Sequence, residues 1–227
     1  MRVNELMVWM DCEMTGLDLA HDELVEVAAL VTDGKLNVLG DGVDLIIKPS
    51  TAAIDQMGDF VRSMHQSSGL LDELDHGLAI DEAEQRVLDY IKEFVPEARK
   101  APLAGNTIGT DRSFLLRHMP RVDAHLHYRS VDVSSIKELA RRWFPRVYFA
   151  QPQKGLAHRA LADIIESVRE LAYYRLTLFV PAPGPNSDQA KEAAEKVVGS
   201  FAEILAAGDA TPRIGVDDVP PPAASEG

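Results

Sequence analysis

The sequence predicts an α/β domain in which a mixed β-sheet is flanked by α-helices. Apolar runs of strand length come first along the chain, and strand-helix units alternate after them. With 227 residues and 46% apolar content, the chain can bury a substantial core. We expect one domain over residues 1–180, followed by a Pro/Ala-rich C-terminal extension over residues 181–227 with a short helix and then a disordered tail.

The first part of the chain predicts an antiparallel meander. Residues 6–10 and 24–32 are apolar runs with the length of buried strands. A turn signal at Asp33-Gly34 precedes a third run over residues 35–39, and residues 43–47 add a fourth. These runs would form the start of the sheet.

Helices and shorter strands alternate in the rest of the chain. Residues 81–95 repeat apolar side chains at helical spacing, with Asp81 and Glu84 placed as a capping box and Pro96 as a stop. Pro120 is placed to end a further helix. The other expected elements are strands over residues 102–104 and 128–133, and helices over residues 111–118, 134–144, 160–179 and 187–207.

The charge distribution favours a small anionic ligand over a long one. The net charge of −13 disfavours a long polyanion lying across the surface, because such binding depends on neutralising many phosphates. Residues 99–159 nevertheless carry 12 Lys and Arg against 4 Asp and Glu, which suits an anion held at one local site. The alternative is a solvated helix face, since Arg141, Arg142 and Arg146 share one predicted helix and its end.

Cysteine content and hydropathy indicate a cytoplasmic protein. The single cysteine, Cys12, excludes an internal disulfide framework and any multi-cysteine zinc site, as expected of a chain in a reducing compartment. Strand alternation points its side chain away from its neighbours Asp11 and Glu13, which predicts a buried filler instead of a nucleophile. The apolar run at residues 6–10 is too short for a membrane span or a signal peptide, so we expect no membrane association.

Four acidic residues form a candidate metal site. Asp11 and Glu13 stand two apart near the end of a buried strand, so both carboxylates point to one face. Asp163 lies on a helix flank between apolar residues, where a buried acid would be costly without a cation. Asp111 follows a predicted strand and loop, although it could also serve as a helix N-terminal charge. An oxygen-only ligand set favours Mg²⁺ or Mn²⁺.

His158 is the candidate general base. It precedes Asp163 by five positions, which is about 140° around an ideal helix, so the two cannot share a helical face. We therefore place His158 just ahead of the helix or in its first turn, on a segment that follows Gly155. An imidazole with a pKa of about 6.5 can accept a proton from water near neutrality.

The ordered acids and histidine resemble the DEDDh exonuclease superfamily, whose fold is RNase H-like. The similarity covers residues 6–178, and the connecting segments look like the oligoribonuclease family. They read WMDCEMTGL at residues 9–17, GNTIGTDR at 105–112, YRSVDVS at 128–134 and LARRW at 139–143.

This resemblance implies a 3′→5′ exoribonuclease that hydrolyses short oligoribonucleotides, dinucleotides especially, to 5′-mononucleotides. Asp11, Glu13, Asp111 and Asp163 would bind two divalent cations, and His158 would be the general base. The resemblance also implies a homodimer. The implied substrate-binding residues are Leu17 and Phe60 around the 3′ base with His65 nearby, and Thr107, Arg129 and Ser134 around the 5′ phosphate, with Tyr128 and Arg129 contributed by a second subunit.

Two of these positions depart from the family pattern. Phe60 stands where we expect Trp, and its smaller ring stacks over less area, which puts base affinity in question but not the reaction. Thr107 replaces an expected Ser and keeps the hydroxyl. Leu17 and Phe60 could instead belong to the core.

Two alternative functions remain. A DEDDh proofreading DNA exonuclease would share the five catalytic residues and would cleave longer single-stranded DNA. A nucleic-acid-binding module could hold a metal for structure alone, but such a module would not need His158 as a base.

Overall fold

The computed structural model describes residues 6–153, 155 and 159–209. Its contacts divide the chain into two compact units, one ending at Phe179 and the other beginning at Val180. The first unit contains the whole β-sheet and nearly all the helices.

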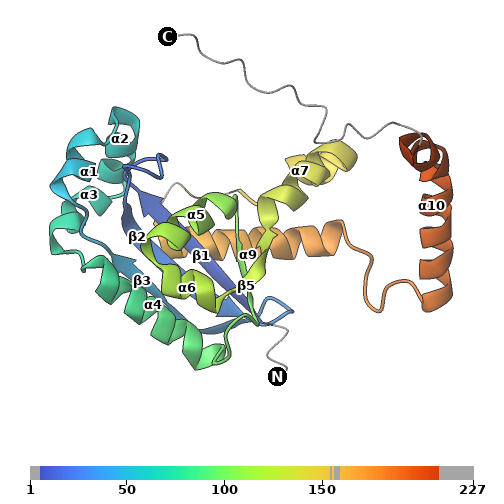
Figure 1. Cartoon of the computed structure of the whole chain (residues 1–227), viewed down its shortest axis with the longest axis horizontal. Helices are drawn as coiled ribbons and strands as arrows, with labels where there is room; N and C mark the ends of the chain where they lie inside the picture. Colours follow the sequence, from blue (N-terminus) through green and yellow to red (C-terminus); the bar gives the residue numbers. More distant parts are fainter. Residues whose placement is uncertain (1–5, 154, 156–158, 210–227) are drawn as a thin grey trace, which may run out of the picture. The chain divides into compact units, whose positions relative to one another are not determined.

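The first unit is built on a five-stranded mixed sheet with the strand order β3-β2-β1-β4-β5 (Figure 1). The pairs β1–β2 and β2–β3 are antiparallel, whereas β4 runs parallel to β1 and β5 runs parallel to β4. This arrangement confirms the predicted mixed sheet that begins as a meander. The strands are β1 (Met7–Met14), β2 (Leu24–Thr32), β3 (Val38–Ile46), β4 (Pro102–Gly105) and β5 (His127–Asp132).

Helices cover both faces of the sheet. Along β1, Val8 and Met10 face one core cluster with α4, α5 and α6, while Trp9 faces a second cluster with α7 and α9. Figure 1 shows α9 running across the strands. These helices are α4 (Ile80–Phe94), α5 (Gly109–His118), α6 (Pro120–His125), α7 (Val133–Trp143) and α9 (Ala160–Thr177).

Most of the run at residues 43–47 and the end of the run at residues 35–39 belong to one strand, β3, which begins only at Val38. Gly40 and Gly42 lie inside it with φ of 72° and 83°. Because glycine often marks a turn, these two residues made the sequence resemble a break between two strands. Pairing with β2 continues past both glycines, with a register shift between Ala29 and Val31. A bulge in a continuous strand therefore replaces the expected pair of runs.

Two helix starts differ from the sequence prediction, and the predicted end of α5 at His118 is confirmed. The expected capping box of α4 is absent: Ala79 is the N-cap without a side-chain bond, and Glu84 instead accepts hydrogen bonds from Arg121. Helix α7 begins at Val133, one residue before the expected start at Ser134. Its N-cap is Asp132, whose side chain accepts a hydrogen bond from the Ser134 N–H. Pro120 follows the end of α5 and also opens α6, where its missing N–H costs nothing.

Several short helices were not predicted. Most of their residues are exposed, and four of the five span six residues or fewer, which is too short for a helical repeat of apolar residues to be recognised; in α2 only His65 is buried. They lie in the chain between β3 and α4 and after α7. They are α1 (Thr51–Gln56), α2 (Asp59–Ser67), α3 (Leu70–Glu73), the 3₁₀ turn η2 (Leu74–His76) and α8 (Pro145–Phe149).

The second unit contains α10 (Ser187–Asp209), which includes the helix expected over residues 187–207. The expected disordered tail lies outside the described residues, which end at 209. Among the helices of the described residues, none combines the length and the apolar character that a membrane span requires.

Candidate active site

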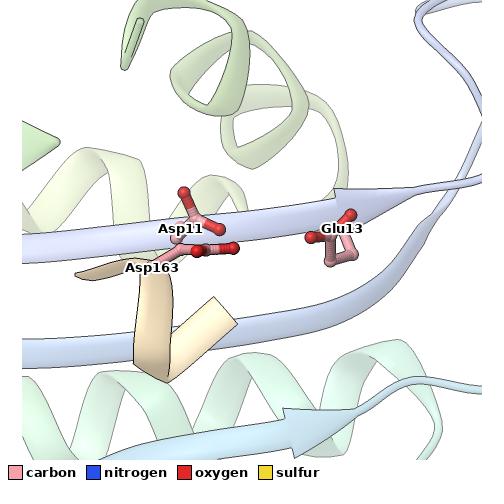
Figure 2. A group of neighbouring side chains, drawn as sticks. All are labelled: Asp11, Glu13 and Asp163. Carbon is pink, nitrogen blue, oxygen red and sulfur yellow. The ribbon is translucent and has the colours of Figure 1, made fainter. Parts of the chain in front are cut away.

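Three of the predicted acids meet on the α9 face of the sheet. Asp11 and Glu13 lie on β1, which continues to Met14, so both acids belong to the strand itself. Asp163 lies in the first turn of α9 and faces them (Figure 2). One carboxylate oxygen from each of the three lies within 4.8 Å of the others, a spacing that can hold a metal ion.

Asp111 approaches the same place from the opposite side of β1. It lies in the first turn of α5 and is 7% exposed. Its Oδ1 accepts the backbone N–H of Cys12 at 3.0 Å, which fixes the carboxylate against the strand between Asp11 and Glu13. The Cys12 side chain is itself buried, as alternation predicted.

The crowded acids resist ionisation. Burial, together with the negative charges of Asp111, Glu13 and Asp163, raises the pKa of Asp11 to about 9. Burial and the neighbouring carboxylates raise the pKa of Glu13 to about 8, and burial raises that of Asp111 to about 6. A divalent cation would supply the positive charge that these groups lack, so the electrostatics fit a metal site.

All four acids line one cleft of about 390 Å³. The cleft is lined by Asp11, Cys12, Glu13, Met14, Leu17, Asn106, Thr107, Thr110, Asp111, Asp163 and Ser167.

The loop after β4 places a hydroxyl pair at the rim of this cleft. Thr107, with φ of 53°, donates its N–H to Ser134 Oγ at 2.9 Å, and the two hydroxyl oxygens are 3.1 Å apart. Asn106 accepts from the Ser134 hydroxyl and donates to Ser167 Oγ on α9 at 2.8 Å. Gly105 lets the loop approach β1, because an added Cβ would lie 2.9 Å from the Met10 carbonyl oxygen.

The expected base-binding residues fall into two environments. Leu17 and Phe60 are 75% and 81% exposed, so neither belongs to the core. His65 is fully buried, with Nε2 2.8 Å from the Met14 carbonyl oxygen and Nδ1 4.0 Å from Glu13 Oε2. His65 therefore holds the end of β1 through the Met14 carbonyl group and lies next to Glu13.

Tyr128 and Arg129 do not line the cleft of their own chain. Both lie on β5, the edge strand of the sheet, where Tyr128 is 74% exposed. The Arg129 guanidinium carbon lies 5.4 Å from the centre of the Tyr128 ring.

His158 lies outside the described residues, which resume at Arg159. The chain on both sides of it is anchored. Gly155 donates its N–H to Glu166 Oε1 at 2.6 Å, and Arg159 donates from Nε to Glu26 Oε1 at 2.8 Å.

Polar residues around the site that the sequence did not single out include Asn106, Ser167 and Glu26. Asn106 and Ser167 line the cleft, and Glu26 is a fully buried carboxylate on β2. Glu26 could have been noticed as the only charged residue within the apolar run of residues 24–32. Asn106 and Ser167 carried no such signal, because their contact depends on the packing of α9 against the β4 loop.

Comparison with known proteins agrees with this architecture. The exonuclease family model matches residues 8–171, which contain the sheet and all four acids. Solved structures of exonuclease I share the fold: one from Methylocaldum szegediense superposes with a TM-score of 0.58 at 20% identity, over 76% of this chain and 41% of that one. An E. coli exonuclease I bound to a dT13 oligonucleotide gives 0.59 at 16% identity, over 75% of this chain and 41% of that one.

The fold and the acidic cluster thus define an exonuclease with an RNase H-like domain. Oligoribonucleases from Cutibacterium acnes and Leifsonia xyli are 63% and 61% identical, each over 86% of this chain and over 96% and 94% of their own lengths. An oligoribonuclease from Streptomyces griseus is 60% identical, again over 86% of this chain. The chain belongs to the oligoribonuclease family. It is a 3′→5′ exoribonuclease, and the proofreading alternative is not favoured.

Proposed function

We propose that this enzyme hydrolyses very short oligoribonucleotides, dinucleotides especially, to 5′-mononucleotides with the help of two Mg²⁺ or Mn²⁺ ions. The observation that carries the proposal is the convergence of Asp11, Glu13 and Asp163 within 4.8 Å, beside the buried Asp111. Carboxylate oxygens are the ligands that these hard cations prefer.

The four acids would hold the cations, which lower the pKa of bound water and stabilise the oxygens that attack and leave during phosphodiester hydrolysis. His158 would take the proton of the attacking water. Attack at the last phosphodiester forms a new P–O bond and breaks the bond to the 3′ oxygen of the preceding nucleotide. The 5′-mononucleotide then leaves.

The shape of the site supports a short substrate. Leu17 at the cleft and Phe60 on α2 offer exposed apolar surface on which the 3′ base can stack. The Thr107 and Ser134 hydroxyls lie at the rim, where they would bind the 5′ phosphate. His65, which is buried beside Glu13, would lie near the 3′ base.

We further propose that the enzyme is a homodimer in the cytoplasm. Tyr128 and Arg129 are exposed on an edge strand away from their own cleft, so a second copy would bring them to a 5′ phosphate. The single, buried cysteine suits a reducing compartment.

We also assign catalysis to a domain over residues 1–180 and treat residues 181–227 as an extension. The exonuclease match ends at residue 171, and the contacts of the structure separate at Val180. The extension would then be dispensable for turnover.

The decisive experiment measures turnover of a 5′-labelled RNA dinucleotide with Mg²⁺ or Mn²⁺, alongside a long RNA and a long single-stranded DNA. We expect rapid cleavage of the dinucleotide and slow cleavage of both long substrates. Asp163→Asn and His158→Ala should each lower turnover by at least about 100-fold with unchanged far-UV circular dichroism. Equal or faster cleavage of long DNA would contradict the proposal, and loss of fold in either variant would reassign that residue to structure.

A further inference from the structure

Arg159 connects three elements at the entrance to α9. It is the N-cap residue of this helix. Its Nε lies 2.8 Å from Glu26 Oε1 on β2, and a terminal nitrogen lies 2.8 Å from Glu73 Oε1 on α3. The N–H of Ala160 also donates to Glu26 Oε2 at 3.2 Å. The start of α9 is thus tied to the sheet by both side chain and backbone.

Glu26 is next to the acidic cluster. It pairs directly with Glu13 across the β1–β2 ladder, so the two side chains share the α9 face of the sheet. Its side chain is fully buried, whereas that of Arg159 is 31% exposed. A buried carboxylate is tolerated only with well-placed donors, so Glu26 fixes where Arg159 must lie.

The same contact fixes Asp163. The N–H of Asp163 donates to the Arg159 carbonyl oxygen at 3.0 Å, which places the acid one turn into the helix. A shift of Arg159 would therefore move the whole first turn, including a carboxylate that must stay within 4.8 Å of Asp11 and Glu13.

We infer that Arg159 is a positioning residue: by bridging Glu26 and Glu73 it holds the first turn of α9 so that Asp163 completes the metal site, and it thereby sets metal affinity. The inference rests on the proposed metal site. It does not require Arg159 to touch metal or RNA.

An arginine is needed because one planar group must reach two carboxylates in different directions. Lysine keeps the charge but offers a single ammonium, which cannot reproduce both bonds. Arg159→Lys therefore changes geometry while leaving the charge near the acids unchanged. In Arg159→Ala, by contrast, loss of a nearby positive charge would favour cation binding and mask the effect.

The chain provides a matched control in Arg121 and Glu84. Glu84 is a nearly buried carboxylate that also accepts an arginine Nε, at 2.7 Å, and a backbone N–H, at 2.6 Å. This pair joins α4 to α6 and lines no part of the acidic cleft. Arg121→Lys should thus cost comparable stability without reaching the metal site.

The test measures Mn²⁺ binding to the full-length protein by electron paramagnetic resonance in the absence of RNA, together with the melting temperature. We expect Arg159→Lys to weaken Mn²⁺ binding by about tenfold, as loss of a residue that orients a ligand usually does, and Arg121→Lys to change it by less than about twofold. At saturating Mn²⁺ most of the lost turnover should return. An unchanged affinity in Arg159→Lys, or an equal loss in Arg121→Lys, would overturn the inference.

Two further variants keep the outcomes distinct. If Arg159→Lys does not fold, Glu73→Ala removes the outer bond to Arg159 and should still weaken Mn²⁺ binding, whereas Asp72→Ala removes a neighbouring carboxylate that does not bind Arg159 and should not. Equal effects of these two would refute the positioning role. Failure of wild-type protein to bind Mn²⁺, or full binding by Asp163→Asn, would instead refute the proposed metal site itself.

Discussion

At the scale of single residues, the acids of the cleft are held in a state that disfavours their charge. Their folded-state pKa values lie above the ordinary ones, at about 9 for Asp11 and about 8 for Glu13. At pH values below the ordinary pKa of Asp and Glu, these carboxyl groups are protonated in both the folded and the unfolded chain. As pH rises, the unfolded chain releases them first, so the metal-free fold loses stability until the folded-state pKa values are passed.

A pH-dependent response to metal follows from this sign. We predict that saturating Mg²⁺ raises the melting temperature more at pH 8.5 than at pH 6, by about 4 °C or more, because the cation removes a repulsion that grows with pH. Differential scanning fluorimetry with and without EDTA measures both shifts. Asp11→Asn should flatten the dependence, and an increment that is larger at pH 6 would contradict this account.

Individual residues also show which contacts of the site can be predicted from the sequence. Asp11 and Glu13 were predicted on one face because strand alternation requires it, and the structure confirms that geometry. The contact between Asn106 and Ser167, and the burial of Glu26 beneath Arg159, were not predictable. Each joins residues 61 or more positions apart, and no local pattern encodes such distances.

At the scale of elements, apolar periodicity predicted the buried strands and the helices α4, α7 and α9, each of which buries one face, whereas the described side chains of α10 are exposed. The short helices were not predicted. Helix α2 is only nine residues long and buries only His65, while Phe60, one of its apolar residues, faces solvent. Such exposure contributes little to folding, because Phe60 stays in contact with water, but it leaves a surface on which a base can stack.

Helix α2 should therefore contribute to substrate affinity and little to stability. We predict that Phe60→Ala raises the KM for an RNA dinucleotide about tenfold, with kcat within about twofold and an unchanged melting temperature, because a stacking surface is lost and no core is opened. Phe60→Trp should lower the KM by enlarging that surface. Phe149→Ala on α8 is the matched control, since Phe149 is 82% exposed and does not line the cleft. If both alanine variants behave alike, α2 is not a base-binding element.

At the scale of the whole molecule, one chain offers a metal site without the full set of proposed phosphate contacts. The acids, Leu17 and Thr107 line one cleft, while Tyr128 and Arg129 lie on edge strand β5 outside it. An exposed edge strand can pair with another chain, which would bury its free backbone groups and carry both side chains to a second cleft. Under this arrangement each site is composite.

A composite site can be tested by complementation. We expect the double variant Tyr128→Ala/Arg129→Ala and the variant Asp163→Asn each to cleave RNA dinucleotides poorly. The first keeps the metal ligands and lacks the proposed phosphate contacts, whereas the second keeps the phosphate contacts and lacks a metal ligand. Co-expressed with separate affinity tags, they form heterodimers with one complete site. Random pairing then restores roughly a quarter of wild-type turnover, since half of the dimers are mixed and each has one active site of two. Recovery in tandem-purified heterodimers places Tyr128 and Arg129 in the partner's site, whereas no recovery in a confirmed heterodimer would show that they act within their own chain.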